Sequence, residues 1–322
     1  MLEGQVVKLD RGYPLVRTEA GEELRCKHAT ALVKGEKVRA VIGDRVLLDV
    51  PQGHDKAIIA EILPRATEFV RKDPTERALP QVLAANFDHV LIAQPIGDVN
   101  LRRLERELVL AHETGADVSV ILTKADLAGN EDIERITHEV EELVGQQDTV
   151  LVVSAEEPTS IDAVRKLMAP GTTTVLIGKS GVGKSSLVNL LVGSEVQETA
   201  EVREVDGKGR HTTVSREMID VPGGGRVVDM PGVRGLGLWD AESGIEAAFS
   251  DIEELAASCK FRDCHHEGEP GCAVRRAVEE GTLAQGRLDS YHALRNETVE
   301  IRERREEASR IRSRTGHPRR RG

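Results

Sequence analysis

Hydrophobic and polar residues alternate in short runs over the first 66 positions of the chain. Five such runs begin with the letters G-Q-V-V-K-L, P-L-V-R-T, E-E-L-R-C-K, K-V-R-A-V-I and K-A-I-I-A-E, and glycines separate them. A period of two predicts half-buried strands, and the glycines supply the turns between them. Five short strands at this spacing predict a small barrel over residues 1–66, most simply an OB-fold.

The pattern breaks after this segment. Residues from Pro64 to Pro80 are highly charged and include three prolines, which is typical of a connecting stretch. We therefore expect a linker over residues 67–80.

Beyond Gln81, continuous apolar runs alternate with amphipathic ones. The apolar runs predict buried strands at Val90–Ala93, Val118–Leu122, Val150–Val153, Thr173–Ile177 and Val227–Asp229. The amphipathic runs predict helices at Leu101–Glu113, Glu131–Leu143, Ile161–Leu167 and Lys184–Leu191. This alternation predicts an α/β domain over residues 81–242, with a parallel sheet and helices on both faces.

From Ser243 the chain is predicted to form helices around a cysteine cluster, over residues 243–300. A charged helix is expected from Leu283 to about Arg312, and residues 301–322 form a basic tail. A chain of 322 residues has room for these domains. No apolar run reaches the length of a membrane span, and the first residues lack a basic, then apolar, signal pattern, so we expect a cytoplasmic protein with no membrane partner.

The charge of the chain is unevenly distributed. A formal net charge of −11 argues against nucleic-acid binding, yet Arg310–Gly322 contains six arginines and no acidic residue. A basic tail on an acidic body is typical of proteins that contact RNA. The alternative is a solvated tail with no partner.

A phosphate-binding loop follows the apolar run T-V-L-I. The motif is G-x4-G-K-S, and its expected nucleotide ligands are Gly178, Lys179, Ser180, Gly181, Val182, Gly183, Lys184, Ser185 and Ser186. Glycines allow backbone N–H groups to curl around phosphates, and the start of the following helix favours an anion. Lys184 is expected at the β- and γ-phosphates, and the Ser185 hydroxyl on Mg²⁺.

Two further loops predict that the base is guanine. Thr123-Lys124-Ala125-Asp126 follows one buried strand, and Ser154-Ala155-Glu156 follows another. The Asp126 carboxylate can accept from guanine N1–H and the exocyclic amine, whereas adenine offers no such pair of donors. A polar site of this kind can discriminate by about ten-thousandfold. The backbone N–H of Ala155 is expected at guanine O6, and Lys124 along the base plane.

The switch segments come after the phosphate loop. D-M-P-G begins at Asp229, which can hold Mg²⁺ through water, and the Gly232 N–H can sense the γ-phosphate. Upstream lies K-G-R-H-T-T, from which Thr212 or Thr213 is expected to bind Mg²⁺; we favour Thr213.

The residue after D-M-P-G is Val233, which cannot orient an attacking water as a glutamine would. His211 is the nearest candidate for that role, and the alternative is an exposed loop histidine. Lys184, Gly232 and His211 are thus the expected catalytic group.

These five motifs occur in a rotated order. An ordinary GTPase begins with the phosphate loop and ends with the base-reading loops. Here both base-reading loops come first, followed by the phosphate loop and the two switches. The order predicts a circularly permuted P-loop GTPase that uses GTP and Mg²⁺.

Three of the four cysteines lie within fourteen residues. Cys259, Cys264, His266 and Cys272 offer enough ligands to close a tetrahedral structural zinc site. His265 is the competing imidazole, and three free cysteines are the alternative to a metal.

The chain resembles the ribosome small-subunit-dependent GTPase family, the circularly permuted GTPases of ribosome assembly. The strings that carry the resemblance are Q-V-L-A-A-N-F-D, G-K-S-G-V-G-K-S-S, K-G-R-H-T-T, D-M-P-G and C-K-F-R-D-C-H-H-E-G-E-P-G-C. The resemblance implies an OB-fold, hydrolysis stimulated by the 30S subunit, a late role in 30S maturation and contact with 16S rRNA. It also implies that His211 is catalytic on the ribosome and that His266, rather than His265, binds zinc. We expect a monomer.

Two features depart from the family pattern. Thr123 stands where the base-reading loop usually has Asn. Tyr13 is the only aromatic residue of the barrel, so phosphate and shape contacts are expected to dominate its RNA contact over base stacking. Two other functions are alternatives to a ribosome-assembly GTPase. One is an RNA-binding scaffold in which nucleotide turnover is not required, and the other is a P-loop ATPase or small-molecule kinase. Asp126 and the S-A-E loop argue against the last.

Overall fold

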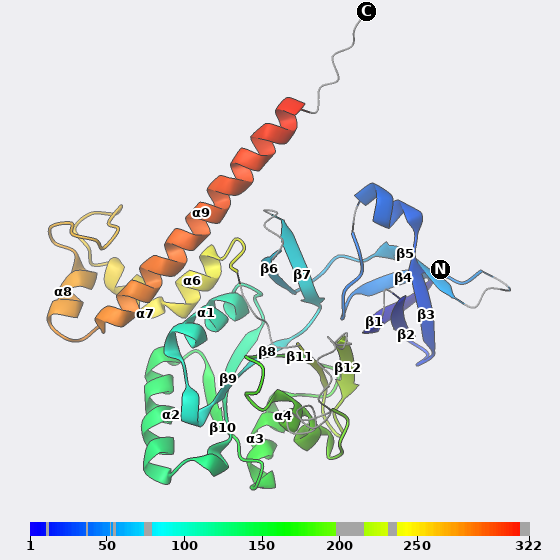
Figure 1. The fold of residues 1–322 in the computed structure, drawn as a ribbon, viewed down its shortest axis with the longest axis horizontal. Helices are drawn as coiled ribbons and strands as arrows, with labels where there is room; N and C mark the ends of the chain where they lie inside the picture. Colours follow the sequence, from blue (N-terminus) through cyan, green and yellow to red (C-terminus); the bar gives the residue numbers. More distant parts are fainter. Residues whose placement is uncertain are drawn as a thin grey trace, which may run out of the picture. The chain divides into compact units, whose positions relative to one another are not determined.

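A computed structural model describes the chain except for residues 11–12, 37, 52, 54–55, 74–78, 198–215, 231–236 and 316–322. The chain packs as two compact units (Figure 1). Unit 1 comprises residues 1–69, 82–100 and 114–234, and unit 2 comprises residues 70–81, 101–113 and 235–322. Each unit is assembled from separate stretches of chain. The division of the sequence at residues 66, 80, 242 and 300 stays a prediction.

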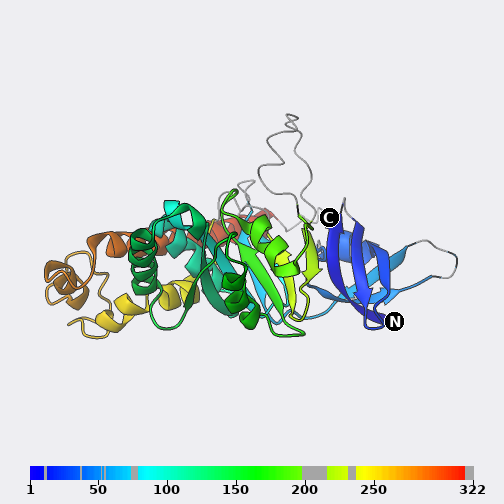
Figure 2. The same ribbon diagram turned by 90° about the horizontal axis from the view of Figure 1, so that it is seen from below.

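The first 62 residues of unit 1 form a closed barrel, shown in blue in Figure 2. Its strands are β1 (Leu2–Asp10), β2 (Tyr13–Thr18), β3 (Glu23–His28), β4 (Arg45–Asp49) and β5 (Ala57–Ile62). They pair in the order β1-β2-β3-β5-β4, and β4 pairs again with β1 to close the sheet. Alternate residues such as Val6, Val16 and Val46 are fully buried inside it. The predicted five-stranded, OB-type barrel is confirmed. A π-helical turn at Ala31–Glu36 was not predicted.

The rest of unit 1 is built on a sheet whose order is β10-β9-β8-β11-β13-β12. Its strands are β8 (His89–Pro95), β9 (Asp117–Thr123), β10 (Thr149–Val152), β11 (Thr173–Ile177), β12 (Arg216–Asp220) and β13 (Arg226–Asp229). All neighbours are parallel except β12, which runs antiparallel to β13. β11 lies between β8 and β13, so the later half of the sequence completes a sheet begun by the earlier half. This arrangement confirms the permuted α/β fold.

The sheet is continuous with the barrel through an unpredicted strand. β12 pairs antiparallel with β1, with Lys8 opposite Glu217. The side chains of these two residues form an ion pair of 2.6 Å. The letters R-E-M-I-D of β12 are too short and polar to stand out as a strand in the sequence.

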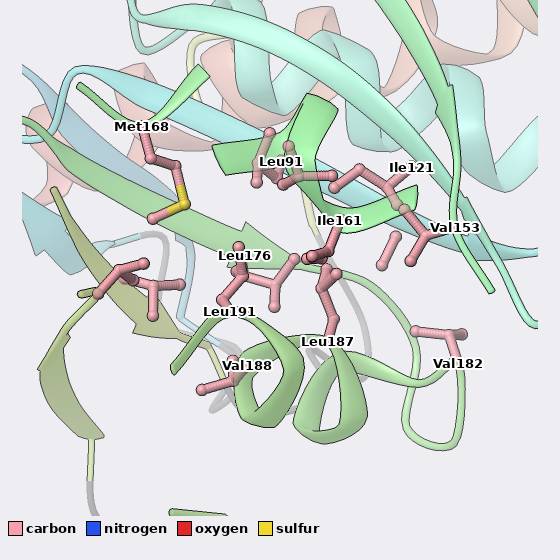
Figure 3. Close-up of a cluster of buried hydrophobic side chains, with 14 residues drawn as sticks. Leu91, Ile121, Val153, Ile161, Met168, Leu176, Val182, Leu187, Val188 and Leu191 are labelled. Carbon is pink, nitrogen blue, oxygen red and sulfur yellow. The ribbon is translucent and has the colours of Figure 1, made fainter. Parts of the chain in front are cut away.

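Helices α3 (Ile161–Leu167) and α4 (Lys184–Val192) pack on the sheet through a buried apolar cluster, drawn in Figure 3. Leu176 of β11 lies among Leu187, Val188 and Leu191 of α4, and all four are at most 2% exposed. Helix α2 (Asn130–Val144) contacts β10. These helices begin and end within a residue of their predicted bounds, because their apolar stripes are regular.

The segment expected as a linker is not structureless. Strand β6 (Glu68–Lys72) lies within residues 67–80 and pairs with β7 (Pro80–Ala85). Its Phe69 is fully buried. Pro64 precedes β6 and Pro80 is the first residue of β7, positions at which strands tolerate proline.

Unit 2 is mainly helical. It contains α1 (Leu101–His112), α6 (Glu242–Ala248), α7 (Ser250–Ala256), α8 (Ala273–Glu279) and the 31-residue α9 (Gln285–Thr315). α1 packs against α6 so closely that a side chain on Gly244 would lie 2.1 Å from the Val109 carbonyl. Among the described residues, no helix is long and apolar enough to cross a membrane.

Candidate functional site

The phosphate loop leaves the carboxyl end of β11 and leads into α4. Gly178 lies in a backbone conformation, φ 143°, that other residues rarely adopt, and a side chain there would lie 2.6 Å from the Ala93 carbonyl of β8. Only glycine allows this close approach. The loop is therefore shaped by its contact with the neighbouring strand.

Two side chains hold the loop from the inside. The ammonium of Lys184, a residue that is 6% exposed, donates to the carbonyls of Gly178 at 2.8 Å and Lys179 at 3.1 Å. Val182 is buried in the apolar cluster beneath α4 (Figure 3). A glycine-rich loop with a cation held against it suits a phosphate group.

The two expected base loops meet at the same edge of the sheet. Asp126 follows β9, and Ser154–Glu156 follow β10, the strand beside it. One carboxylate oxygen of Asp126 accepts from the Ser154 hydroxyl at 3.3 Å and from the Ala155 backbone N–H at 3.2 Å. The structure thus brings together two loops that the sequence separates by 28 positions.

Thr123 connects the base loops to the phosphate loop. Its hydroxyl lies 2.5 Å from the Val182 carbonyl and 3.2 Å from the Gln94 carbonyl, at the end of β8. Lys124 follows in the left-handed conformation, with φ 60°. The chain turns sharply there, so that Asp126 faces the loop after β10.

The expected Mg²⁺ ligands are placed only in part. Ser185 lies at the start of α4, where its hydroxyl donates to the Gln197 side-chain oxygen at 3.2 Å. Asp229 ends β13, directly opposite Leu176 of β11, and so lies at the edge that carries the phosphate loop. His211, Thr212, Thr213, Gly232 and Val233 lie outside the described residues.

In unit 2, Cys259, Cys264, His266 and Cys272 converge. Their four ligand atoms all lie within 4.8 Å of one another. The Sγ atoms of Cys259 and Cys272 are 3.9 Å apart, and His266 Nδ1 lies 3.7 Å and 3.4 Å from them. A tetrahedral zinc ion with bonds of about 2.0–2.3 Å requires edges of roughly 3.5–3.8 Å. The donor set and spacing fit such an ion, so the cluster can hold a metal.

The structure separates the two neighbouring histidines. His266 is 3% exposed, and its backbone takes a positive φ of 63°. Burial lowers the pKa of His266, and nearby Arg295 and His292 lower it further, so the neutral form that binds metals is favoured. His265 is exposed, and its carbonyl lies 3.0 Å from the ring of His292.

Glu269 supports the cluster and was missed from the sequence. Its carboxylate accepts from the backbone N–H groups of His265, Glu267 and Gly268 at 2.8–3.1 Å. These bonds lower the pKa of Glu269 to about 2. An acidic residue between two glycines, in the string E-G-E-P-G, was the available signal for a loop that folds around a carboxylate.

Comparison with known proteins agrees with this geometry. A family model described as RsgA GTPase matches residues 62–239. A small ribosomal subunit biogenesis GTPase RsgA from Streptomyces avermitilis is 42% identical over 306 residues, spanning 94% of this chain and 80% of that protein. The protein of the same name from Methanosarcina acetivorans is 43% identical over 259 residues, or 80% and 69% of the two chains.

Two solved structures are similar over almost the whole chain. The crystal structure of YjeQ from Thermotoga maritima superposes with a TM-score of 0.68 at 26% identity, covering 92% of this chain and 98% of that one. The structure of YloQ, described as a circularly permuted GTPase, gives a TM-score of 0.64 at 27% identity, covering 94% and 96%. The chain therefore belongs to the RsgA GTPase family and is a GTPase with circularly permuted motifs.

Proposed function

We propose that this GTPase acts in late maturation of the small ribosomal subunit and that the 30S subunit stimulates its hydrolysis of GTP. The names of the relatives support the first part, since they describe biogenesis of that subunit. The observation that carries the nucleotide site is the hydrogen-bonded contact between three loops at one sheet edge, through Thr123 and Asp126. Ligands bind at this carboxyl edge in parallel sheets.

In this proposal the phosphate loop, Gly178 to Ser186, binds the phosphates through its backbone, and Lys184 neutralises the β- and γ-phosphates. Lys184 is already held inside the loop by two carbonyls, so little side-chain entropy is lost when an anion replaces them. The loops at Thr123–Asp126 and Ser154–Glu156 select guanine. Among the described residues, protein donors reach only one carboxylate oxygen of Asp126, which leaves the other for guanine.

Mg²⁺ would be held by Ser185 and Thr213, with Asp229 acting through water, and would polarise the γ-phosphate. Gly232 would sense that phosphate and His211 would position the attacking water. The bond from Ser185 to Gln197 is compatible with this role, because a rotation of the Ser185 hydroxyl releases it.

We assign a structural zinc ion to the four-residue cluster in unit 2. Three sulfurs and one imidazole close a tetrahedron and leave no open position for catalysis. The metal would hold α7 and α8 together, because Cys259 follows the first helix and Cys272 precedes the second.

The barrel at residues 1–66 and the basic tail at residues 301–322 are proposed to contact 16S rRNA, the latter through phosphates. The proposed domain division of the chain is completed by a linker at 67–80, a GTPase domain at 81–242 and a zinc domain at 243–300. We propose that the protein acts as a monomer, in the cytoplasm, where ribosomal subunits mature.

Co-sedimentation with purified 30S subunits tests the partner. The full chain is centrifuged with 30S or 50S subunits in the presence of GDP or a non-hydrolysable GTP analogue. We expect binding to 30S that is stronger with the analogue than with GDP, and none to 50S. Equal binding to both subunits would reject the 30S assignment. Binding to 30S without any change in GTP turnover would favour the alternative, a nucleotide-binding RNA scaffold.

A further inference from the structure

The side chain of Thr123 is turned away from solvent and into the protein. It is 4% exposed, and its hydroxyl faces two backbone carbonyls, those of Val182 and Gln94. The first belongs to the phosphate loop and the second to the end of β8. The hydroxyl therefore joins the start of the base loop to the phosphate loop.

The number of protons on the hydroxyl decides whether Thr123 can donate a hydrogen bond to the base. A threonine hydroxyl has one hydrogen to donate, whereas an asparagine amide has two. In the described part of the chain, both neighbours at hydrogen-bond distance are acceptors. Whichever carbonyl is used, the single proton of Thr123 is committed to the backbone. Guanine N7 is an acceptor and needs a donor. Thr123 has no second proton to donate to guanine N7.

We infer that Thr123 is a positioning residue and not a base-contacting one, and that this GTPase recognises guanine without a hydrogen bond from position 123 to N7. The inference rests on the proposed binding of guanine nucleotides at this edge. Recognition then depends on Asp126 for the N1 and amino donors. The Ala155 N–H, which donates to Asp126 at 3.2 Å in this structure, would have to leave that carboxylate to reach the O6 acceptor.

The positioning role follows from where the bonded carbonyl lies. Val182 is packed in the core beneath α4, and Gly183 follows it. A side chain on Gly183 would lie 3.5 Å from the Thr123 hydroxyl and 3.9 Å from Cε of Lys124, so the phosphate loop and base loop are in direct contact there. Thr123 thus fixes the separation between the part of the site that binds phosphates and the part that binds the base.

A nucleotide that lacks N7 tests the inference on the unmodified protein. The full chain is titrated with GDP and with 7-deaza-GDP, in which a C–H group replaces N7, and heat release gives each Kd. We expect the two values to agree within about twofold. A Kd for 7-deaza-GDP that is tenfold or more weaker would show a donor at N7 and overturn the inference. Failure to bind either nucleotide would reject the proposed nucleotide site itself.

Three variants then locate the effect at position 123. Thr123→Val keeps the shape and removes the hydroxyl, so GDP and 7-deaza-GDP should both weaken by about tenfold, the size of one lost hydrogen bond to a buried carbonyl. Thr123→Ser should restore both affinities. Thr123→Asn adds a second donor and should bind GDP about tenfold more tightly than 7-deaza-GDP.

Thermal unfolding of each variant shows whether it is folded. If Thr123→Val unfolds, the comparison of Thr123→Asn with the unmodified protein still decides the question. Equal affinity of Thr123→Asn for the two nucleotides would contradict the assignment, as would a loss confined to GDP in Thr123→Val.

Discussion

Asp126 joins the two base loops through a single carboxylate oxygen, and the proposed guanine site depends on its other oxygen. Replacing Asp126 by Ala should weaken GDP binding by about a hundredfold or more, because two charge-assisted hydrogen bonds are lost. Binding of ATP, which we expect to be weak, should not change. Fluorescence titration with labelled GDP and ATP measures both.

Asp132→Ala is the matched control for this prediction. Asp132 is an exposed aspartate of α2, paired with Arg135 on the same helix. Its removal should leave nucleotide affinity within about twofold of the unmodified protein. An Asp126→Ala protein with unchanged GDP affinity would remove this residue from the base site.

His211 lies outside the described residues, and its proposed role concerns hydrolysis alone. His211→Ala should keep GDP and GTP affinity but lose most of the 30S-stimulated rate, by roughly a hundredfold, as expected for removal of an acid–base or water-positioning group. His138→Ala, an exposed histidine of α2, serves as the control. Unchanged stimulated turnover in His211→Ala would exclude it from the mechanism.

For single residues, the sequence predicts which residues form the site better than it predicts the contacts they make. The loop residues could be named because phosphate and guanine binding impose fixed residue types at fixed spacing. The bond from Thr123 to Val182 could not be predicted, because it joins loops 59 residues apart. Glu269 was missed for a similar reason: its partners are backbone N–H groups, which no residue type marks.

Among the elements, α9 is tied to α1 and to the chain before α6 by the half-buried carboxylate of Glu297. Glu297 of α9 accepts from Arg106 of α1 at 2.7 Å and 2.9 Å, and from the Leu238 N–H at 3.2 Å. Burial of Glu297 acts to raise its pKa, but the hydrogen bonds and charge of Arg106 outweigh it and the pKa is lowered. The ionised form is therefore the one that stabilises unit 2.

This lowered pKa predicts a pH dependence. A carboxyl whose pKa is lower in the folded state stabilises the fold above its unfolded pKa, near 4.5, and the contribution is lost as the pH falls through the folded value. Glu297→Gln should therefore reduce the free energy of unfolding by about 1–3 kcal/mol at pH 7. The difference from the unmodified protein should shrink below about pH 4.5.

Urea unfolding followed by the fluorescence of Trp239 measures this effect, because Trp239 is the only tryptophan and lies in unit 2. Glu300→Gln is the control on the same helix, since Glu300 is exposed and pairs only with Arg304 among the contacts described. A Glu297→Gln effect that did not vary with pH would show that the charge of Glu297 is not its cause.

The sequence predicted α1 to within a residue of its observed end, but not its partners. Its pattern is that of a helix of the α/β domain, yet it packs with the C-terminal helices in unit 2. Buried Glu105 pairs with Arg287 of α9 at 2.9 Å, across 182 positions of sequence. Strands β6 and β12 escaped prediction because they are both short and polar, whereas the equally short β11 contains an apolar run that marks a buried strand.

On the scale of the whole molecule, the nucleotide site and the metal cluster belong to different units. All four metal ligands lie in unit 2, whereas every described residue of the proposed nucleotide site lies in unit 1. Removing the metal with a chelator should therefore lower the urea midpoint of the Trp239 transition and leave the Kd for GDP within about twofold. Metal analysis should give one zinc ion per chain before treatment and none after it.

Cys272→Ser should reproduce the effect of the chelator without its side reactions, and Cys26→Ser offers a control, because Cys26 lies in the barrel. An unchanged midpoint in metal-free protein would show that the cluster does not stabilise unit 2. A loss of GDP affinity on chelation would contradict the separation of the two sites.

The rotated motif order predicted the sheet correctly because strand order is a property of space and not of the chain. β11, which carries the phosphate loop, lies between β8 and β13 as the nucleotide site requires. The motif order did not predict how the chain divides between the two units. Residues 101–113 continue the α/β pattern of the sequence but belong to unit 2. That division depends on side chains more than a hundred positions away.

The central claim is that the small ribosomal subunit switches on GTP hydrolysis at this permuted site. Phosphate release is measured with saturating GTP for the protein alone, with purified 30S subunits and with 50S subunits. We predict slow turnover alone and with 50S, and a rate at least tenfold higher with 30S that is lost in Asp126→Ala. The same rate with and without 30S would contradict the account.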